Sequence, residues 1–190
     1  MALASAAMTE QGSGPAAARP RWRRTLLISA ALMAAAYAAI YFPYPADSLP
    51  GRLLSRYVEL QAALAGALIR LFDDTARVQG HNITGRFPLV IVMDCAALDA
   101  KALFLAAVLA FPAPWRRKLL SAAAGLAAIA AVNALRIVTL HLVGRYRPQA
   151  FELMHEEVLQ LAIVASAVAA FALWVRWTQR PREVPARAPA

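Results

Sequence analysis

The chain contains a single cysteine, Cys95, among its 190 residues, and few charged residues. One thiol cannot form an intramolecular disulfide, so Cys95 is either packing filler or a reactive group. Only 16% of the residues are charged, whereas 61% are hydrophobic, and this composition excludes an ordinary soluble domain of this length. The sequence therefore predicts an integral membrane protein.

The net charge of +9 comes from an excess of basic residues over only 11 acidic ones. A basic chain can bind nucleic acid, but here the arginines gather at the ends of apolar segments. At those positions they act as topology signals and contact lipid headgroups. The charge pattern therefore indicates a membrane partner and argues against nucleic-acid binding.

Low-complexity segments at both ends predict flexible basic tails over residues 1–24 and 178–190, around one membrane-embedded domain over residues 25–177. The first apolar segment, residues 25–42, follows a cluster of arginines and has no convincing small-x-small cleavage site after it. Pro43-Tyr44-Pro45 ends this helix with interfacial aromatic groups. We therefore expect a retained transmembrane span with a cytoplasmic N-terminus.

Three further apolar segments, residues 95–111, 119–143 and 158–177, are long enough or nearly long enough to cross a hydrocarbon core ~30 Å thick. Charged residues interrupt residues 51–72, which favours an amphipathic helix at the outer interface over a full span. Residues 76–93 alternate apolar residues with glycines, as in short strands around a turn. The predicted fold is an all-α polytopic membrane protein with about four transmembrane helices, one interfacial or partly inserted helix, and a hairpin-like segment before Cys95.

Basic clusters predict the orientation of these spans. The cluster Trp115-Arg116-Arg117-Lys118, and the arginines that follow the last span, should be cytoplasmic by the positive-inside rule. Both termini are then cytoplasmic and residues 43–94 lie outside the membrane, although Arg145 and Arg147 also fall on the outer side against the rule. We expect a multi-pass protein of the cell inner membrane, in contact with its lipids.

This topology brings unusual polar residues to the extracytoplasmic side. Cys95 begins the second span, Arg136 lies in the third about seven residues from its outer end (~10 Å deep), and His155 precedes the fourth. A charge at that depth is costly unless it faces a partner or water, so Arg136 marks a candidate functional site. Asn133 lies three residues before Arg136 and shares its helical face.

Together these residues suit acyl transfer by a cysteine nucleophile. Helix N-terminal N–H groups and a guanidinium favour the thiolate of Cys95, Arg136 or backbone N–H groups can stabilise an oxyanion, and His155 can carry the proton. Asp94 either caps the helix or opposes ionisation of the thiol, and the sequence leaves both open. The roles of His81 and His141 are also left open.

The order of a Val-rich extended approach to Cys95, then Asn133-x-x-Arg136 within an apolar helix, then His155 before a last span resembles the exosortase and archaeosortase family of membrane transpeptidases. The resemblance covers about residues 76–177. It implies a catalytic set of Cys95, Arg136 and His155, with histidine in third place as in the bacterial branch. Many members carry a small residue and then glycine after the cysteine, whereas this chain has Ala96-Ala97.

The resemblance further implies membrane-anchored protein substrates whose C-terminal tail contains a short motif, a transmembrane helix and a basic cluster. Such a substrate would be cleaved on the extracytoplasmic side and transferred to a cell-surface acceptor, a glycan or a lipid. The shortness of the chain resembles that of the compact members.

Two other classes compete with this interpretation. A non-enzymatic membrane subunit would use Arg136 and Asn133 as interhelical polar contacts, with Cys95 as filler. A small transporter is disfavoured because no internal repeat is discernible. A zinc site of Cys95, His141 and His155 lacks any recognisable ligand spacing, so we expect no metal and no cofactor.

Overall fold

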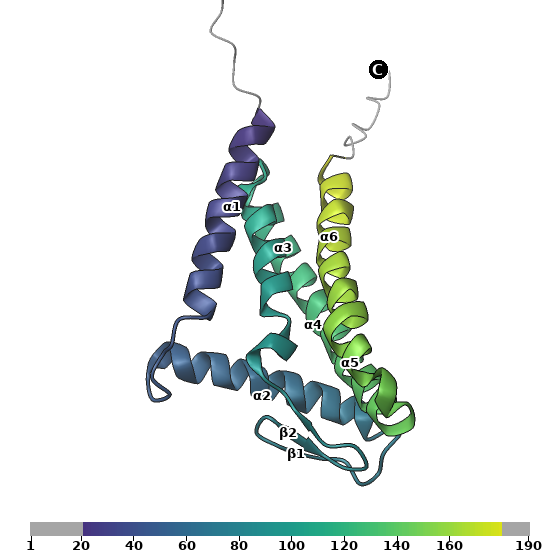
Figure 1. The fold of residues 1–190 in the computed structure, drawn as a ribbon. Coiled ribbons are helices and arrows are strands. Elements are labelled where there is room, and N and C mark those ends of the chain that lie inside the picture. Colours follow the sequence, from purple (N-terminus) through teal and green to yellow (C-terminus); the bar gives the residue numbers. More distant parts are fainter. Residues whose placement is uncertain (1–20, 180–190) are drawn as a thin grey trace, which may run out of the picture.

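The computed structural model describes residues 21–179 and is mostly helical, with one small sheet, as the sequence predicts (Figure 1). The tails predicted at residues 1–24 and 178–190 lie largely outside the described residues, although residues 21–24 belong to the first helix. In chain order the elements are α1 (Arg21–Ile40), α2 (Leu49–Ile69), β1 (Arg77–Gln79), β2 (Asn82–Thr84), β3 (Leu89–Val90), η1 (Met93–Ala96), α3 (Leu98–Ala110), α4 (Trp115–Tyr146), η2 (Pro148–Ala150), α5 (Phe151–Leu153), η3 (Met154–Val158) and α6 (Leu159–Thr178).

Three helical stretches of the described chain are long and apolar enough to cross a membrane: Trp22–Ile40, Trp115–Tyr146 and Pro148–Thr178. The remaining predicted span, residues 95–111, is shorter than expected, because α3 has 13 residues and is ~20 Å long at 1.5 Å per residue. The 3₁₀ turn η1 precedes it and adds ~8 Å at about 2.0 Å per residue. Because the left-handed Ala97 separates η1 from α3, the helix α3 by itself is shorter than a ~30 Å hydrocarbon core.

The helices α1, α3, α4 and α6 run up and down beside one another, and α2 crosses the bundle at one end (Figure 1). That end also holds the sheet and the turns before α6, whereas the start of α1, the α3–α4 connection and the end of α6 lie at the opposite end. The apolar stripe of α2 packs toward α4 and η1, and its N-terminus is capped by Ser48, whose Oγ accepts from the Gly51 N–H at 3.2 Å. The crosswise orientation agrees with the predicted interfacial helix.

The segment predicted to contain short strands forms a three-stranded antiparallel sheet in the order β1-β2-β3. A tight turn joins β1 to β2, and Gly80 in this turn has φ +58°, a conformation that glycine adopts without strain. Ile83 of β2 is fully buried, and Val78 of β1 lies directly over Gly66 of α2. The sheet therefore packs on α2, and its strand β3 leads the chain to Cys95.

Asp73 joins the end of α2 to the sheet and to α4. Its buried carboxylate accepts hydrogen bonds from Thr75 Oγ1 at 2.6 Å, Thr75 N–H at 3.0 Å and Arg86 N–H at 2.9 Å. His141 Nε2 of α4 lies 3.4 Å from Asp73 Oδ2, without the geometry of a hydrogen bond. The hydrogen bond from Thr75, followed by those from backbone N–H groups and by the charge of Arg86, holds the pKa of Asp73 well below its ordinary value of 3.8.

The Asp73 network predicts an acid-dependent loss of stability. Because the folded-state pKa is lowered, the stabilisation is complete above about 3.8 and is lost as the pH falls toward the folded value. We expect Asp73→Asn to lower the melting temperature in detergent at neutral pH, and the difference from the native protein to shrink as the pH is lowered below about 4. Asp74→Asn is the matched control, since the Asp74 side chain is 84% exposed. A difference for Asp73→Asn that is constant across this range would contradict the prediction.

Candidate active site

Cys95 lies in the 3₁₀ turn η1, between β3 and α3, and is buried. Its backbone N–H donates to Val92 O at 3.0 Å, and its carbonyl accepts from Asn133 Nδ2 at 2.9 Å. The sequence suggested that the thiol begins a helix, but α3 starts three residues later, at Leu98. The turn η1 therefore fixes the thiol, and the N–H of Cys95 is already used within that turn.

The side chain of His155 reaches the thiol. His155 Nε2 lies 3.4 Å from Cys95 Sγ, across 60 residues of sequence. The sequence placed His155 before the fourth span, but it belongs to the π-helical turn η3, which continues into α6. Such widened turns often occur at functional sites. Phe151, one turn earlier, stacks on the imidazole with ring centroids 5.8 Å apart and an interplanar angle of 16°.

Arg136 approaches the same pair from α4 and is only 6% exposed. Its Nη2 donates to the backbone carbonyl of His155 at 3.2 Å. Its Nε and Nη1 atoms are buried without a hydrogen-bond partner. Because α4 ends at Tyr146, Arg136 lies ten residues from the helix end, ~15 Å deep and deeper than predicted.

Asn133 is fully buried one turn before Arg136, on the same side of α4. Its Nδ2 group donates both to Cys95 O and to Gln61 Oε1 of α2, the latter at 3.1 Å. Asn133 thus holds the nucleophile turn and joins it to α2. Gln61 is buried, and its part in the site was not predicted from the sequence.

A second pair of side chains holds the next carbonyl. Ala96 O accepts from Lys101 Nζ at 2.8 Å and from Tyr57 OH at 3.1 Å, and the ammonium lies 5.1 Å from the Tyr57 ring centroid. Burial raises the pKa of Tyr57 to about 12, so the phenol keeps the proton that it donates. Sequence reasoning missed both donors, although a lysine within an apolar helix was a usable signal for Lys101.

Asp94 does not cap a helix, because neither η1 nor α3 has a side-chain cap. Instead Tyr41 OH lies 3.1 Å from Asp94 Oδ1 and 3.1 Å from Asp99 Oδ2. Burial, and then the charges and hydrogen bonds of both carboxylates, raises the pKa of Tyr41 well above its ordinary value of 10.0. The end of α1 is thereby joined to the nucleophile turn.

Two cavities of different character meet at His155. One, of about 310 Å³, is mostly apolar and contains Cys95; it is lined by residues 87–92, Cys95, Ile137, Leu140, Phe151 and His155. The other, also about 310 Å³, is lined by residues that are all polar or charged: Asp94, Asp99, Arg136, His155, Glu156 and Gln160. A group bound to Cys95 can therefore extend to an apolar side or to a polar side of the imidazole.

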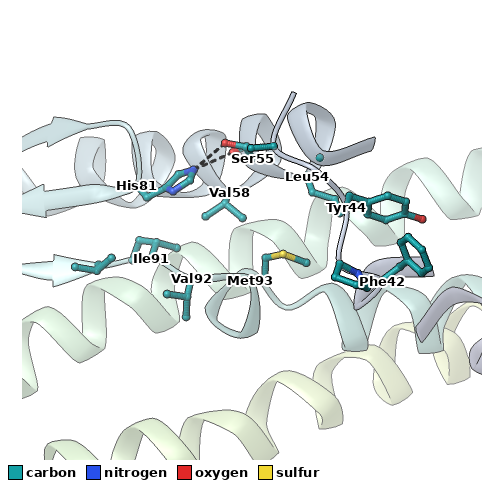
Figure 2. A pocket seen from close by; sticks show the side chains of 13 residues that line it. Phe42, Tyr44, Leu54, Ser55, Val58, His81, Ile91, Val92 and Met93 are labelled. Atoms are coloured by element: carbon teal, nitrogen blue, oxygen red, sulfur yellow. Dashed lines mark hydrogen bonds between the residues drawn. The ribbon is translucent and has the colours of Figure 1, made fainter. Parts of the chain in front are cut away.

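A further cavity of about 450 Å³ shares residues 90–92 with the apolar one and lies next to α2 (Figure 2). His81 Nε2 lies 3.2 Å from Ser55 Oγ and 3.3 Å from Ser55 O, the two contacts drawn in Figure 2. Glu59 Oε1 lies 3.9 Å from the same nitrogen, so no carboxylate orients the other ring nitrogen. Ser55 and His81 therefore lack the arrangement of a Ser-His-acid triad.

The alternative zinc site finds no support in residues 21–179, where no three His, Cys, Asp or Glu side chains are grouped to hold a metal ion. His141 instead contacts Asp73, while His155 contacts Cys95. The chemistry available to the described site is therefore that of a thiol, an imidazole and a guanidinium.

Ala97 connects η1 to α3 in a left-handed conformation, with φ 53° and ψ 36°. Among the described residues it alone combines a side chain with positive φ. This conformation costs a residue with a Cβ roughly 1 kcal/mol. This is the position at which many members of the family that the sequence resembles carry glycine, and glycine adopts positive φ without strain.

Comparison with known proteins gives one family. The model of the transmembrane exosortase family matches residues 22–173. No curated protein and no solved structure matches the chain. The matched region covers α1 to most of α6 and includes Cys95, Arg136 and His155.

The backbone of the nucleophile turn predicts opposite effects for two neighbouring substitutions. Ala97→Gly removes the strain of positive φ, and we expect it to raise the free energy of unfolding by up to about 1 kcal/mol. Ala96→Gly, at negative φ, frees the unfolded chain and also removes a fully buried methyl group, so it should lower the free energy of unfolding by about 1 kcal/mol or more. Thermal melting of both variants in the same detergent checks the pair. A destabilised Ala97→Gly variant would show that the left-handed turn is not strained.

Proposed function

The chain belongs to the transmembrane exosortase family, and from that premise we propose that it is a membrane cysteine transpeptidase or protease acting on C-terminal sorting signals. The observation that carries the proposal is the 3.4 Å separation of Cys95 Sγ and His155 Nε2. Family membership implies protein substrates with such signals. The proposed signal contains a short motif, a transmembrane helix and a basic cluster.

In the first step His155 takes the proton of the Cys95 thiol, and the thiolate attacks the scissile carbonyl carbon. A bond forms between sulfur and carbon, the bond between carbon and nitrogen breaks, and His155 returns its proton to the leaving amine. The products are a thioester on Cys95 and a free transmembrane tail. Stacking on Phe151 and the short contact with the sulfur orient the imidazole for both transfers.

Arg136 is the proposed oxyanion stabiliser. The N–H of Cys95 donates to Val92 O, so it is not free for an oxyanion. Arg136 has two buried donor atoms, Nε and Nη1, without partners, while its Nη2 is fixed on His155 O. A preorganised donor in a site shielded from water stabilises developing negative charge strongly.

In the second step an acceptor hydroxyl or amine, or water, attacks the thioester. His155 takes the proton of the incoming nucleophile, the new bond to carbon forms, and the thiolate leaves with the electron pair of the carbon–sulfur bond. A glycan or a lipid at the cell surface is the proposed acceptor. Attack by water would give hydrolysis instead of transfer.

The two cavities support a direction for the substrate. Cys95 lines only the apolar cavity, so the acyl part stays there, whereas His155 also lines the polar cavity with Asp99 and Gln160. These last two lie within α3 and α6, deeper in the bundle than residues 87–92. The part of the substrate before the scissile bond would enter from the sheet side. The substrate's transmembrane helix, released by cleavage, would leave along the bundle.

We propose that the site is extracytoplasmic and that both termini are cytoplasmic. The support is the basic cluster Arg116-Arg117-Lys118 and Arg176, at the bundle end opposite the sheet (Figure 1).

Loss of the nucleophile tests the reaction. With a co-expressed substrate bearing the three-part tail, Cys95→Ala and Arg136→Ala should abolish processing seen by immunoblot, at unchanged protein level. His155→Ala should reduce the rate roughly 100-fold or more, with residual activity if Glu156 or water carries the proton. Arg147→Ala is the control, because Arg147 is exposed beyond the end of α4. Unchanged processing by Cys95→Ala would favour the non-enzymatic alternative, in which Asn133 and Arg136 only join helices.

Orientation is tested separately with single cysteines in a Cys95→Ala background. Thr84→Cys in the sheet should react with a membrane-impermeant maleimide in intact cells, because that exposed position lies on the outer side. Pro112→Cys, exposed between α3 and α4, should react only after the membrane is opened. The reverse pattern would invert the proposed topology.

A further inference from the structure

The strand β3 has one unpaired edge. In the antiparallel pair with β2, Asn82 lies opposite Val90, and the Ile91 N–H donates to His81 O at 2.9 Å. Hydrogen-bonded and non-hydrogen-bonded pairs alternate along such a ladder. Since Ile91 is in a hydrogen-bonded pair, the N–H and C=O of Val90 point away from β2. They present one donor and one acceptor along the outer edge of the sheet.

This edge leads into the apolar cavity that contains the nucleophile. Six consecutive residues, 87–92, line the cavity on one side, and Cys95 and His155 line it with them. Ile137 and Leu140 of α4 and Phe151 of α5 complete walls that are largely apolar. A chain lying along the edge of β3 would thus reach Cys95 Sγ at the end of the strand.

We propose that the substrate segment just before the scissile bond binds as an added strand along β3, with small or aliphatic side chains in the apolar cavity. The inference rests on the proposed function and gives its substrate a binding mode. A peptide satisfies the free N–H and C=O of Val90, whereas a lipid chain in the same cavity would leave them unpaired. The occupant is therefore an extended peptide.

The direction of this strand follows from the chemistry. β3 runs toward Cys95, and the carbonyl that Cys95 attacks is at the C-terminal end of the bound segment. The added strand is therefore parallel to β3. Residues 89–92 span ~10 Å at about 3.3 Å per residue, so about three substrate residues pair with them.

Backbone methylation of a probe tests the pairing in the native, full-length protein in detergent. The probe is acetyl-trivalyl-alaninal, whose aldehyde carbon is attacked by Cys95 Sγ while its oxygen takes a proton, giving a hemithioacetal. Protection of Cys95 from iodoacetamide, measured by mass spectrometry, reports occupancy. N-methylation that removes a paired N–H should weaken binding by roughly tenfold, and methylation of the adjacent residue, whose N–H points away, should weaken it much less. An equal effect at all positions would overturn the added strand.

The protein side of the same hydrogen bond is tested with Val90→Pro, which removes the outward N–H without removing a bond to β2. Val90→Thr keeps the N–H and changes an exposed side chain, so its loss of probe affinity should be much smaller. The rate of iodoacetamide alkylation without probe should be similar in both variants, which shows an intact nucleophile turn. Equal probe affinity of Val90→Pro and Val90→Thr would contradict the inference.

Failure of this inference is distinguishable from failure of the proposed reaction. If Cys95→Ala abolishes substrate processing but N-methylation has no positional effect, the proposed reaction is supported and the added strand is contradicted. If the Cys95→Ala variant processes the substrate normally, both the proposed reaction and the inference are contradicted.

Discussion

The amide of Asn133 is the contact on which the arrangement of this site depends. One buried nitrogen donates to Gln61 Oε1 of α2 and to Cys95 O of η1, and so joins three elements that are far apart in sequence. Leaving a buried carbonyl without its donor costs about 1–3 kcal/mol, and here two acceptors would be left. The position of the thiol is thus determined by the interior of α4.

Arg136 extends the same face of α4 to the imidazole. Its bond to His155 O fixes the π-helical turn, while its Nε and Nη1 stay buried without a hydrogen-bond partner. Asn133 and Arg136, three residues apart, therefore orient the nucleophile turn and the histidine turn from one rigid helix. Placing both on a packed helix limits the movement of the site, as preorganised chemistry requires.

The sequence was sufficient for the membrane class, the separate helix α2 and the short sheet, because hydropathy, charge and alternation are local patterns. It also singled out Asn133 and Arg136 on one face of α4, which the structure places beside the nucleophile turn and the histidine turn. It was insufficient where distant contacts decide. Tyr57 reaches Ala96 O of the nucleophile turn across 39 residues, and Gln61 accepts from Asn133 across 72 residues. No spacing in the chain indicates either contact. The sequence did not show that His155 is helical. The apolar pattern of the last helix begins only after the π-helical turn η3, and a π-turn departs from the ordinary helical period. The sequence left the role of Asp94 open, because the left-handed Ala97 that separates η1 from α3 is not visible in it.

The different linings of the two cavities favour release of the cleaved tail over the reverse reaction in the proposed mechanism. The proton from His155 lets the tail leave as a neutral amine, which then takes a second proton from water and becomes an ammonium beside the cavity that contains Asp94, Asp99 and Glu156. Tyr41 has one hydroxyl proton for two carboxylates, so it cannot donate to Asp94 and Asp99 at once. The carboxylate left without that donor can receive the ammonium, and this attraction draws the cleaved tail away from the thioester. The acyl group meanwhile remains against apolar walls on the other side of the imidazole, where the next nucleophile must come to it.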